Sequence, residues 1–313
     1  MFEAIYKLIE KYPRIIVYRH KNPDGDAMGA QQGLVRILKE NYPSKEIFAV
    51  GDMTPRYAFM ATLPLDELSD NMYTGALAII LDSGSKFLIS DDRYALADAT
   101  ARIDHHIFCE KIADEEVVDT SFESCCGMIA AMAMECGWQV SPEAAKSLYT
   151  GMITDSGRFR YDSTNAQTFR LASFLMEREF STADIYQNLY ADDLSMIQLR
   201  AKYTLKIQTN NYGVAYIYTP IDEAKSYGVD TFTLSRGMVN VMGEIRGIHT
   251  WVNFTESEGG VLCEIRSNQY NINPIATKYG GGGHQKASGA TLKNKDEAMA
   301  LLDDLNRLSG ETI

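Results

Sequence analysis

The chain has 313 residues, of which 45% are hydrophobic and 23% are charged. This is the composition of a folded globular protein, and the length allows two domains. The formal net charge is −12, so the chain lacks the overall basic field with which proteins that follow long nucleic acids neutralise phosphates. The charge therefore disfavours a long duplex as a partner.

The sequence contains no apolar run of about eighteen residues, which a membrane-spanning helix would require. The N-terminal MFEAIYKLIEKYPR also lacks the apolar stretch and cleavage site of a secretory signal. The five cysteines form no CxxC pair, and Cys125, Cys126 and Cys136 lie in an apolar helical run, which indicates core packing rather than a disulfide framework. We expect a cytoplasmic protein with no membrane partner.

The first part of the chain alternates strand-like and helical patterns. Strands are predicted at residues 14–20, 46–51, 76–84 and 99–106, and residues 26–40 form a predicted helix after the first of them. Helix-length polar or mixed segments separate the strands, and residues 121–180 are mainly helical. This alternation predicts an α/β fold, with a mostly parallel sheet that carries helices on both faces.

The pattern restarts after a polar, helix-prone connector. A strand is predicted at residues 210–220, a hairpin at 249–256 and 260–267, and helices at 271–280 and 295–310. We therefore predict a first domain at residues 1–189, a helical linker at 190–204, and a smaller α/β domain at 205–313.

Polar residues gather where the predicted strands end. HKNPDGD, residues 20–26, follows the first strand, Asp82 ends the third, and Asp104-His105-His106 end the fourth, while Asp155 lies in a helical segment. Most have an ordinary structural explanation by themselves, such as a helix N-cap for Asp24 or Asp26 and a turn for Asp82, whereas an unpaired carboxylate such as Asp155 inside an apolar helix is costly. Because the carboxyl ends of parallel strands converge, however, these side chains are expected on one rim.

Carboxylates crowded on one rim repel each other unless cations neutralise them. A mixture of imidazole and carboxylate ligands suits manganese better than magnesium, which prefers oxygen ligands. Such a site is typical of enzymes that hydrolyse phosphate esters with two metal ions.

These motifs resemble those of a known family. HKNPDGDAMG, the lone Asp82, Asp104-His105-His106 and Asp155 are similar to the four motifs of the DHH phosphoesterase superfamily. Gly280 to Gly283 with His284, followed by QKASG, resemble the GGGH signature of the associated DHHA1 domain. The resemblance covers nearly the whole chain, and the order and spacing of the motifs resemble those of the stand-alone oligoribonuclease branch, the NrnA or nanoRNase type.

The resemblance implies a role for each motif residue. Two divalent cations, manganese by preference, would activate a bridging water, with His106 facing the scissile phosphate as acid or oxyanion donor and Asp82 bridging the cations. The implied metal ligands are His20, Asp24, Asp26, Asp82, His105 and Asp155.

The glycine run has its own physical interpretation. Consecutive glycines let backbone N–H groups approach an anion closely, although a helix stop followed by a loop is the plain alternative. The resemblance implies that this loop and the pair Arg266-Ser267 hold substrate phosphates, and Arg158 is a weaker candidate for the same duty. The implied substrate-binding residues are Arg158, Arg266, Ser267, Gly281, Gly282, Gly283 and His284.

The resemblance leaves the substrate open among short single-stranded RNA of about two to five nucleotides, dinucleotides and small phosphorylated nucleotides such as 3′-phosphoadenosine 5′-phosphate (pAp). The main alternative is a phosphodiesterase of the cyclic-dinucleotide pathway that acts on c-di-AMP or on linear pApA or pGpG. A nucleotide-binding sensor without turnover is the alternative from another class, and a homodimer is also left open.

Overall fold

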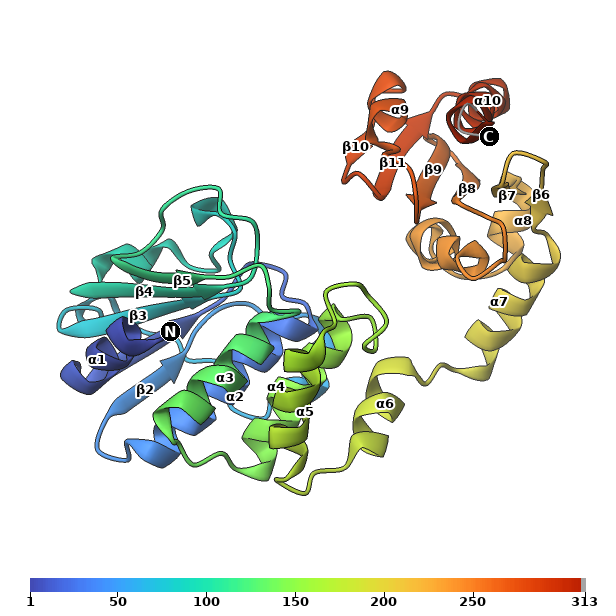
Figure 1. Ribbon diagram of the computed structural model, residues 1–313. Coiled ribbons are helices and arrows are strands. Elements are labelled where there is room, and N and C mark those ends of the chain that lie inside the picture. The colour runs from blue at the N-terminus through green and yellow to red at the C-terminus, as the bar shows by residue number, and fades with distance from the viewer. Residues whose placement is uncertain (311–313) are drawn as a thin grey trace. The chain divides into compact units, whose positions relative to one another are not determined.

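The computed structural model describes residues 1–310. These residues divide into two compact units, and the boundary in the chain lies between Ala191 and Asp192. Figure 1 shows the course of the chain through both units. The stretch predicted as a linker, residues 190–204, overlaps helix α7 (Leu194–Leu205), whose Leu199 and Tyr203 are buried in the core of the second unit. Among residues 1–310, no helix has the length and apolar character needed to cross a membrane.

The first unit is built on a five-stranded parallel sheet in the order β2-β1-β3-β4-β5. Its strands are β1 (Arg14–Tyr18), β2 (Glu46–Ala49), β3 (Ala76–Leu81), β4 (Ala99–Asp104) and β5 (Glu115–Val118). Its α-helices are α1 (Glu3–Lys11), α2 (Gly25–Asn41), α3 (Cys125–Cys136), α4 (Pro142–Asp155), α5 (Ala166–Met176) and α6 (Thr182–Tyr190). The predicted α/β class and the four predicted strands are confirmed, and β5 was not anticipated.

The two faces of this sheet are covered differently. Alternate strand residues such as Val17, Ile79 and Ile103 pack with the α-helices into the larger core. The opposite face, which includes Tyr18 and Ile80, packs under loops that form only short 3-10 turns. These turns are η1 (Pro55–Met60), η2 (Asp70–Met72), η3 (Lys86–Leu88) and η4 (Asp92–Leu96). The segments after β2 and β3, for which the sequence predicts helices, thus form 3-10 turns rather than α-helices, and prolines and glycines interrupt the first of them.

The second unit is a six-stranded mixed sheet in the order β10-β11-β9-β8-β7-β6. Its strands are β6 (Gln208–Thr209), β7 (Val214–Thr219), β8 (Thr250–Ser257), β9 (Gly260–Ser267), β10 (Gly282–Gly283) and β11 (Ala287–Leu292). Helices α9 (Asn273–Lys278) and α10 (Lys295–Gly310) pack on one face, and α7, α8 (Ile221–Ser226) and the single turns η5 (Thr233–Gly237) and η6 (Val239–Met242) pack on the other. The predicted hairpin β8–β9 and the closing helix are confirmed.

Cysteines contribute to packing and form no disulfide among the described residues. Cys125, Cys126 and Cys263 are buried, whereas Cys109 is exposed. Burial raises the pKa of the thiols of Cys125 and Cys126 well above the usual range, so both stay protonated. The prediction that these two residues serve the core is confirmed.

Candidate metal centre

The predicted metal ligands follow three strands that are direct neighbours in the sheet. His20 comes two residues after β1, Asp82 directly follows β3, and His105 directly follows β4. Because β1, β3 and β4 are adjacent and parallel, their carboxyl ends bring the three side chains to one rim. The sheet thus assembles residues that lie far apart in the sequence.

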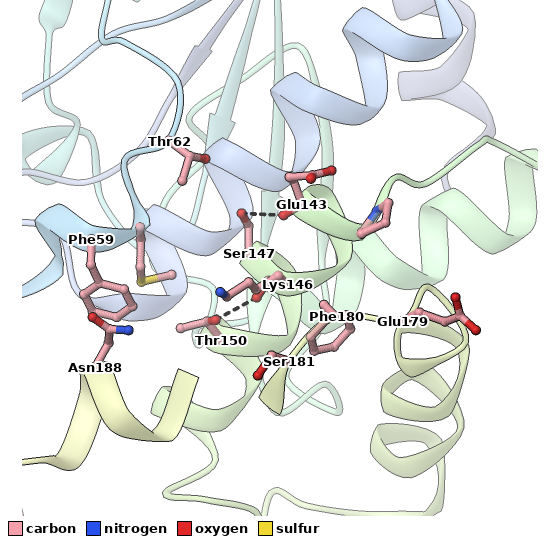
Figure 2. A pocket seen from close by; sticks show the side chains of 12 residues that line it. Phe59, Thr62, Glu143, Lys146, Ser147, Thr150, Glu179, Phe180, Ser181 and Asn188 are labelled. Carbon is pink, nitrogen blue, oxygen red and sulfur yellow. Dashed lines mark hydrogen bonds between the residues drawn. The ribbon is translucent and has the colours of Figure 1, made fainter. Parts of the chain in front are cut away.

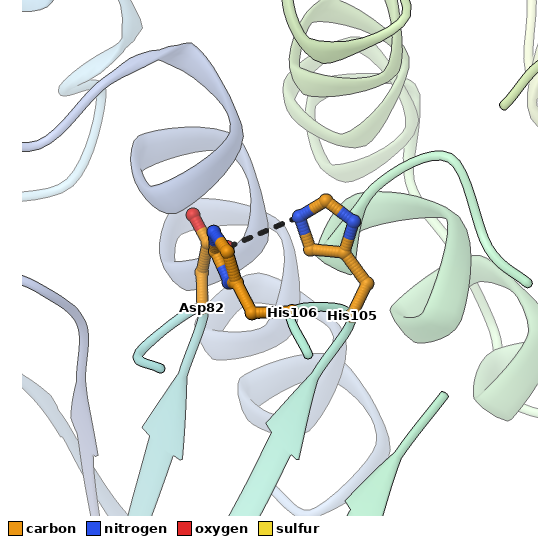
Figure 3. A group of neighbouring side chains, drawn as sticks. All are labelled: Asp82, His105 and His106. Atoms are coloured by element: carbon orange, nitrogen blue, oxygen red, sulfur yellow. Dashed lines mark ion pairs between the residues drawn. The ribbon is translucent and has the colours of Figure 1, made fainter. Parts of the chain in front are cut away.

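Asp82 lies at the centre of this rim. Its Oδ2 is 3.5 Å from Nε2 of His20, and its Oδ1 is 3.5 Å from Nε2 of His105. Figure 3 shows the ring of His105 next to Asp82, with His106 beside it. The carboxylate is almost completely buried, yet Oδ1 accepts no hydrogen bond from the described residues. A buried, unpartnered carboxylate oxygen is costly, and a bound cation would satisfy it.

The backbone at Asp82 is also unusual. Its φ is +50°, which places a residue other than glycine in the left-handed region. Such conformations are uncommon, although aspartate tolerates them better than most residues do. The turn directs the side chain into the rim straight from the strand end, so strain at this position accompanies the placement of the carboxylate.

Asp26 is held by the N-terminus of another helix. Its two oxygens accept hydrogen bonds from the backbone N–H groups of Cys125 (2.7 Å) and Cys126 (2.9 Å) at the start of α3. The positive end of the helix dipole favours a carboxylate at this point. Sequence reasoning did not assign Cys125 and Cys126 this task, because the contact spans about a hundred residues and no local pattern encodes it.

Asp24 combines the two interpretations that the sequence left open. It is the N-cap of α2, and its Oδ1 accepts hydrogen bonds from the N–H groups of Asp26 (2.9 Å) and Ala27 (3.0 Å). Oδ1 also lies 3.8 Å from Nε2 of His20. His20 uses its other ring nitrogen, since Nδ1 donates to the carbonyl oxygen of Lys21 at 2.8 Å, which leaves Nε2 free to act as a ligand.

Close packing of α2 on α4 brings in Asp155. A Cβ on Gly151 would lie 2.2 Å from Sγ of Cys126 and 3.1 Å from Cα of Asp26, so only glycine permits this approach. Asp155 is the last residue of α4, and its Oδ2 is 3.5 Å from Nε2 of His105. A carboxylate at a helix C-terminus faces the negative end of the dipole, and a cation there would relieve this unfavourable interaction.

The side chains form three groups whose potential ligand atoms lie within 4.8 Å of one another. They are His20 with Asp24 and Asp82, Asp26 with His105 and Asp155, and Asp82 with His105 and His106. All six predicted metal ligands are therefore brought together, and Asp82 belongs to two groups. The donor set of carboxylates and imidazoles and the unpartnered Oδ1 of Asp82 both fit a metal centre.

The protonation of the metal-free rim reflects its excess of carboxylates. Burial opposes the charged form of both histidines, but the carboxylates outweigh it and raise the pKa of His20 to about 11 and that of His105 to about 10. Burial raises the pKa of Asp155 to about 7, and burial with the charges of Asp82 and Asp155 raises the pKa of Asp26. Burial also opposes ionisation of Asp82, yet the two imidazoles hold its pKa below the usual range. Without cations, the rim compensates its charge by binding protons.

His106 is positioned differently from His105. Its Nδ1 lies 2.7 Å from Oδ1 of Asp104, and since the carboxylate can only accept, Nδ1 carries the hydrogen. Asp104 is fully buried and is paired with the buried guanidinium of Arg102. This hydrogen bond is the main cause of the raised pKa of His106, whose side chain remains half exposed. Asp104 and Arg102, to which sequence reasoning gave no task, thus orient His106 with Nε2 directed away from the pair.

The glycine run of the second unit is required by the fold at most of its positions. Gly280 has φ +76°, a Cβ on Gly281 would lie 2.1 Å from the carbonyl oxygen of Gly289, and Gly283 has φ +132°. Gly282 differs, because a Cβ there would meet no heavy atom of the described residues within 4 Å. His284 is exposed directly after the run.

The remaining predicted substrate-binding residues differ in how far other parts of the protein engage their side chains. Nη1 of Arg266 donates to Glu264 (3.1 Å) and to the carbonyl of Ile265 (2.8 Å), and the side chain is partly exposed. Ser267 is buried, and its hydroxyl donates to the carbonyl of His249 at 2.7 Å while accepting from the N–H groups of two following residues. The hydroxyl of Ser267 therefore stabilises the turn after β9. Arg158 is exposed and belongs to the first unit, whereas Arg266 and Ser267 belong to the second.

The comparisons with known proteins agree with this geometry. Residues 14–152 match the family described as "DHH family, N-terminal domain", and residues 213–311 match the "DHHA1 domain". Together with the relatives described next, these matches establish that the chain belongs to the DHH family and carries a DHHA1 domain.

Two relatives are similar over nearly the full chain. The bifunctional oligoribonuclease and PAP phosphatase NrnA of Bacillus subtilis is 36% identical over 99% of both chains. The protein of the same name from Mycoplasma pneumoniae is 32% identical over 96% of this chain and 94% of its own. A crystal structure of an exopolyphosphatase-related protein from Bacteroides fragilis superimposes with a TM-score of 0.83 at 23% identity, covering 98% of this chain and 95% of its own, which shows a common fold.

Proposed function

We propose that this protein is a manganese-dependent phosphoesterase that degrades oligoribonucleotides of about two to five nucleotides to mononucleotides and also converts pAp to AMP. The observation that carries the proposal is the position of Asp82, a buried carboxylate within 3.5 Å of two imidazoles, one oxygen of which accepts no hydrogen bond from the described residues. The names of the two relatives described above support the choice of substrates.

The ligand groups support the binding of two cations. We assign His20, Asp24 and Asp82 to one cation, and Asp26, Asp82, His105 and Asp155 to the other. When bound, the cations would lower the pKa of a water between them and neutralise the charge of the phosphate. Two features of the residues suit them to bind cations. Nε2 of His20 is free, and the carboxylate of Asp26 is held by hydrogen bonds from the backbone amides at the start of α3.

His106 is the residue we assign to proton transfer. The hydrogen bond of Nδ1 to Asp104 fixes the ring and leaves Nε2 for the substrate. The pKa of His106 is raised chiefly by that hydrogen bond, so the ring can carry a proton near neutral pH and donate it to a phosphate oxygen or to the leaving group. Asp104 is a positioning residue in this scheme.

The DHHA1 domain is the part to which we assign recognition of the substrate end. Partly exposed Arg266 and exposed His284 are suited to phosphate contacts. Gly282 has no steric need to be glycine, which supports close approach of a ligand to its backbone. The net charge of −12 disfavours the trailing phosphates of a long strand, which supports a short substrate.

The two alternative functions, a phosphodiesterase of the cyclic-dinucleotide pathway and a nucleotide-binding sensor, receive less support. The relatives described above carry the oligoribonuclease and PAP phosphatase name, so action on cyclic dinucleotides is not favoured. A sensor without turnover would not need the complete set of ligands, yet all six are present and grouped. The free cysteines support a reducing compartment such as the cytoplasm.

The test is a time course on end-labelled RNAs that range from a dinucleotide to a strand of roughly two dozen nucleotides, with manganese, with magnesium, and with chelator. We expect release of mononucleotides with manganese, fastest for the shortest RNAs, and release of phosphate from pAp. Equal or faster degradation of the longest strand than of a trinucleotide would contradict the proposed length preference. Turnover in chelator would contradict the metal requirement.

A further inference from the structure

Some arginines of the first unit are held in ion pairs, and others are stacked on tyrosine rings. Arg14, Arg19, Arg93, Arg102 and Arg178 each lie within 4 Å of a carboxylate. Arg56 and Arg158 have no such partner among residues 1–310, and both are exposed. Each guanidinium instead lies over a tyrosine ring: that of Arg158 is 4.2 Å from the ring centre of Tyr190, and that of Arg56 is 5.4 Å from that of Tyr57. A stacked guanidinium keeps its hydrogen-bond donors available for an anion.

The backbone around Arg158 is strained immediately after a metal ligand. Gly157, Arg158 and Phe159 have φ values of +57°, +64° and +61°, so two residues other than glycine adopt the left-handed conformation in succession. Conformations of this kind cost roughly 1–3 kcal/mol each and persist where the surrounding structure enforces them. They turn the chain within three residues of Asp155, so that Arg158 stays close to the rim.

Several contacts enforce this left-handed turn. The N–H of Arg158 donates to the carbonyl of Ile153 (2.8 Å), and the N–H of Phe159 donates to Oγ of Ser156 (2.9 Å). The ring of Phe159 packs at 5.9 Å from that of Tyr149 and at 5.6 Å from that of Phe169. The placement of Arg158 is therefore built into the fold.

The turn η1, which carries Arg56 and Tyr57, is tied to the metal-ligand loop. Oγ1 of Thr54 donates to the carbonyl of Pro23 at 3.1 Å, and the N–H of Asn22 donates to Asp52 at 2.9 Å. Both contacts hold the segment before η1 against the loop that carries Asp24. In agreement, the charges of Asp24 and Asp155 both contribute to the raised pKa of Tyr57, for which burial is the main cause.

Helix α6, which ends with Tyr190, lies beside η1. Phe59 of η1 and Asn188 of α6 line the same cavity of about 480 Å³, and Figure 2 shows these two side chains next to each other. The charges of Arg158 and Arg56 both act on Tyr190, whose pKa is raised mainly by burial. Arg56, Tyr57, Arg158 and Tyr190 thus form one group, named here the arginine–tyrosine cluster, beside Asp24 and Asp155.

We propose that the arginine–tyrosine cluster is a phosphate-binding subsite of the first unit, which holds a non-scissile phosphate of the oligonucleotide next to the metal centre. Arg56 and Arg158 supply the charge-assisted hydrogen bonds. Tyr57 and Tyr190 are positioning residues that hold the guanidiniums by stacking. The inference rests on the proposed function, and it supplies on the first unit the local positive charge that an acidic protein needs for such a substrate.

The experiment compares a substrate that has one phosphate with one that has several. Hydrolysis of bis(p-nitrophenyl) phosphate is measured with manganese, and a trinucleotide is added as competitor to obtain its apparent inhibition constant from initial rates. The variants are Arg56→Gln, Arg158→Gln and the double variant, and the matched control is Arg170→Gln, on an exposed arginine of α5. Glutamine keeps a long polar side chain and removes only the charge.

We expect each variant to raise the inhibition constant of the trinucleotide about tenfold relative to Arg170→Gln, and to lower hydrolysis of bis(p-nitrophenyl) phosphate much less. The dependence of trinucleotide binding on salt should also be weaker in each variant than in Arg170→Gln, because one charged contact is lost. Equal losses on both substrates, or inhibition constants that match the control, would overturn the subsite.

Tyr190 separates positioning from a merely structural role. Tyr190→Phe keeps the ring under Arg158, whereas Tyr190→Leu keeps much of the volume without a π face. The first should bind the trinucleotide as the unchanged protein does, and the second should resemble Arg158→Gln; equal behaviour of both variants contradicts the stacking argument. If the unchanged protein binds the trinucleotide but releases no mononucleotide, the proposed function fails, while the shifts in inhibition constant still decide the subsite.

Discussion

Replacement of Asp82 by asparagine tests the metal centre most directly. Asp82→Asn preserves the shape of the side chain, and asparagine tolerates the φ of +50° at this position. The substitution removes one negative charge from the point where two ligand groups meet. We expect the variant to lose bound metal and turnover while it keeps its fold.

The magnitude of the metal loss follows from electrostatics. At an effective dielectric constant of about 20, a unit charge pair at about 4 Å is worth ~4 kcal/mol, so a divalent cation in contact with Asp82 loses at least that much. This corresponds to a decrease in metal affinity on the order of a thousandfold. Turnover at ordinary metal concentration should fall by at least a similar factor.

The effect on the metal-free fold is smaller, because opposing interactions change together. Asp82 Oδ1 and Asp26 Oδ2 lie within 3.7 Å of the same nitrogen of His105, and besides burial the repulsion between their charges contributes to the raised pKa of Asp26. The substitution relieves this repulsion but removes the attraction to His20 and His105, which can then release their protons. We expect the free energy of unfolding to change by no more than ~2 kcal/mol, about 4–8 °C in Tm for a domain of this size.

The assay combines metal analysis after dialysis, thermal unfolding with manganese or chelator, and hydrolysis of bis(p-nitrophenyl) phosphate. Metal should raise the Tm of the unchanged protein and not that of Asp82→Asn, since a ligand stabilises only the state that binds it. Asp98→Asn, on an exposed residue before the other end of β4, is the matched control. Two tightly bound ions in Asp82→Asn, with turnover within tenfold of the control, would refute the assignment.

Three further predictions concern other parts of the site. His105→Ala should lose metal, whereas His106→Ala should keep it and lose ~10²–10⁴ in rate; equal metal content and equal rates in the two variants would remove the division of labour. Arg266→Ala should raise KM and lower kcat, about tenfold each, because a loosely held end misplaces the scissile phosphate, and an unchanged kcat would limit Arg266 to binding. Metal affinity should rise between about pH 6 and pH 8, since burial raises the pKa of Asp155 to about 7 and the carboxylates raise those of His20 and His105 to about 11 and 10, so that protons on all three compete with the cation; an affinity at about pH 8 that calorimetry finds equal to or lower than that at about pH 6 would contradict this ligand set.

Much of the metal centre could be predicted from the sequence, because it depends on strand ends. Apolar runs predicted β1, β3 and β4, and polar residues directly after them had to meet on one rim once the sheet was parallel. The structure brings all six predicted ligands together. The glycine run and His284 were also recognisable as a motif, and the family assignment agrees with both domains.

Other features were decided only by the tertiary structure. The amides that hold Asp26 come from a helix about a hundred residues away, and no local pattern connects them. Ser267 was predicted to bind substrate, but its hydroxyl is engaged by the turn after β9, a contact that depends on the pairing of β8 with β9. Both cases are contacts between distant segments.

The sequence by itself determined which polar residues gather at the rim, since residue type and position after a strand suffice for that. Only the tertiary structure decided how each of them is oriented. Arg102 pairs with Asp104, and Asp104 accepts a hydrogen bond from Nδ1 of His106. These two contacts distinguish His106 from its neighbour His105. The physical reason is that hydrogen bonds and ion pairs in a buried rim depend on distances of a few ångströms between elements, which the fold sets and which local sequence does not encode.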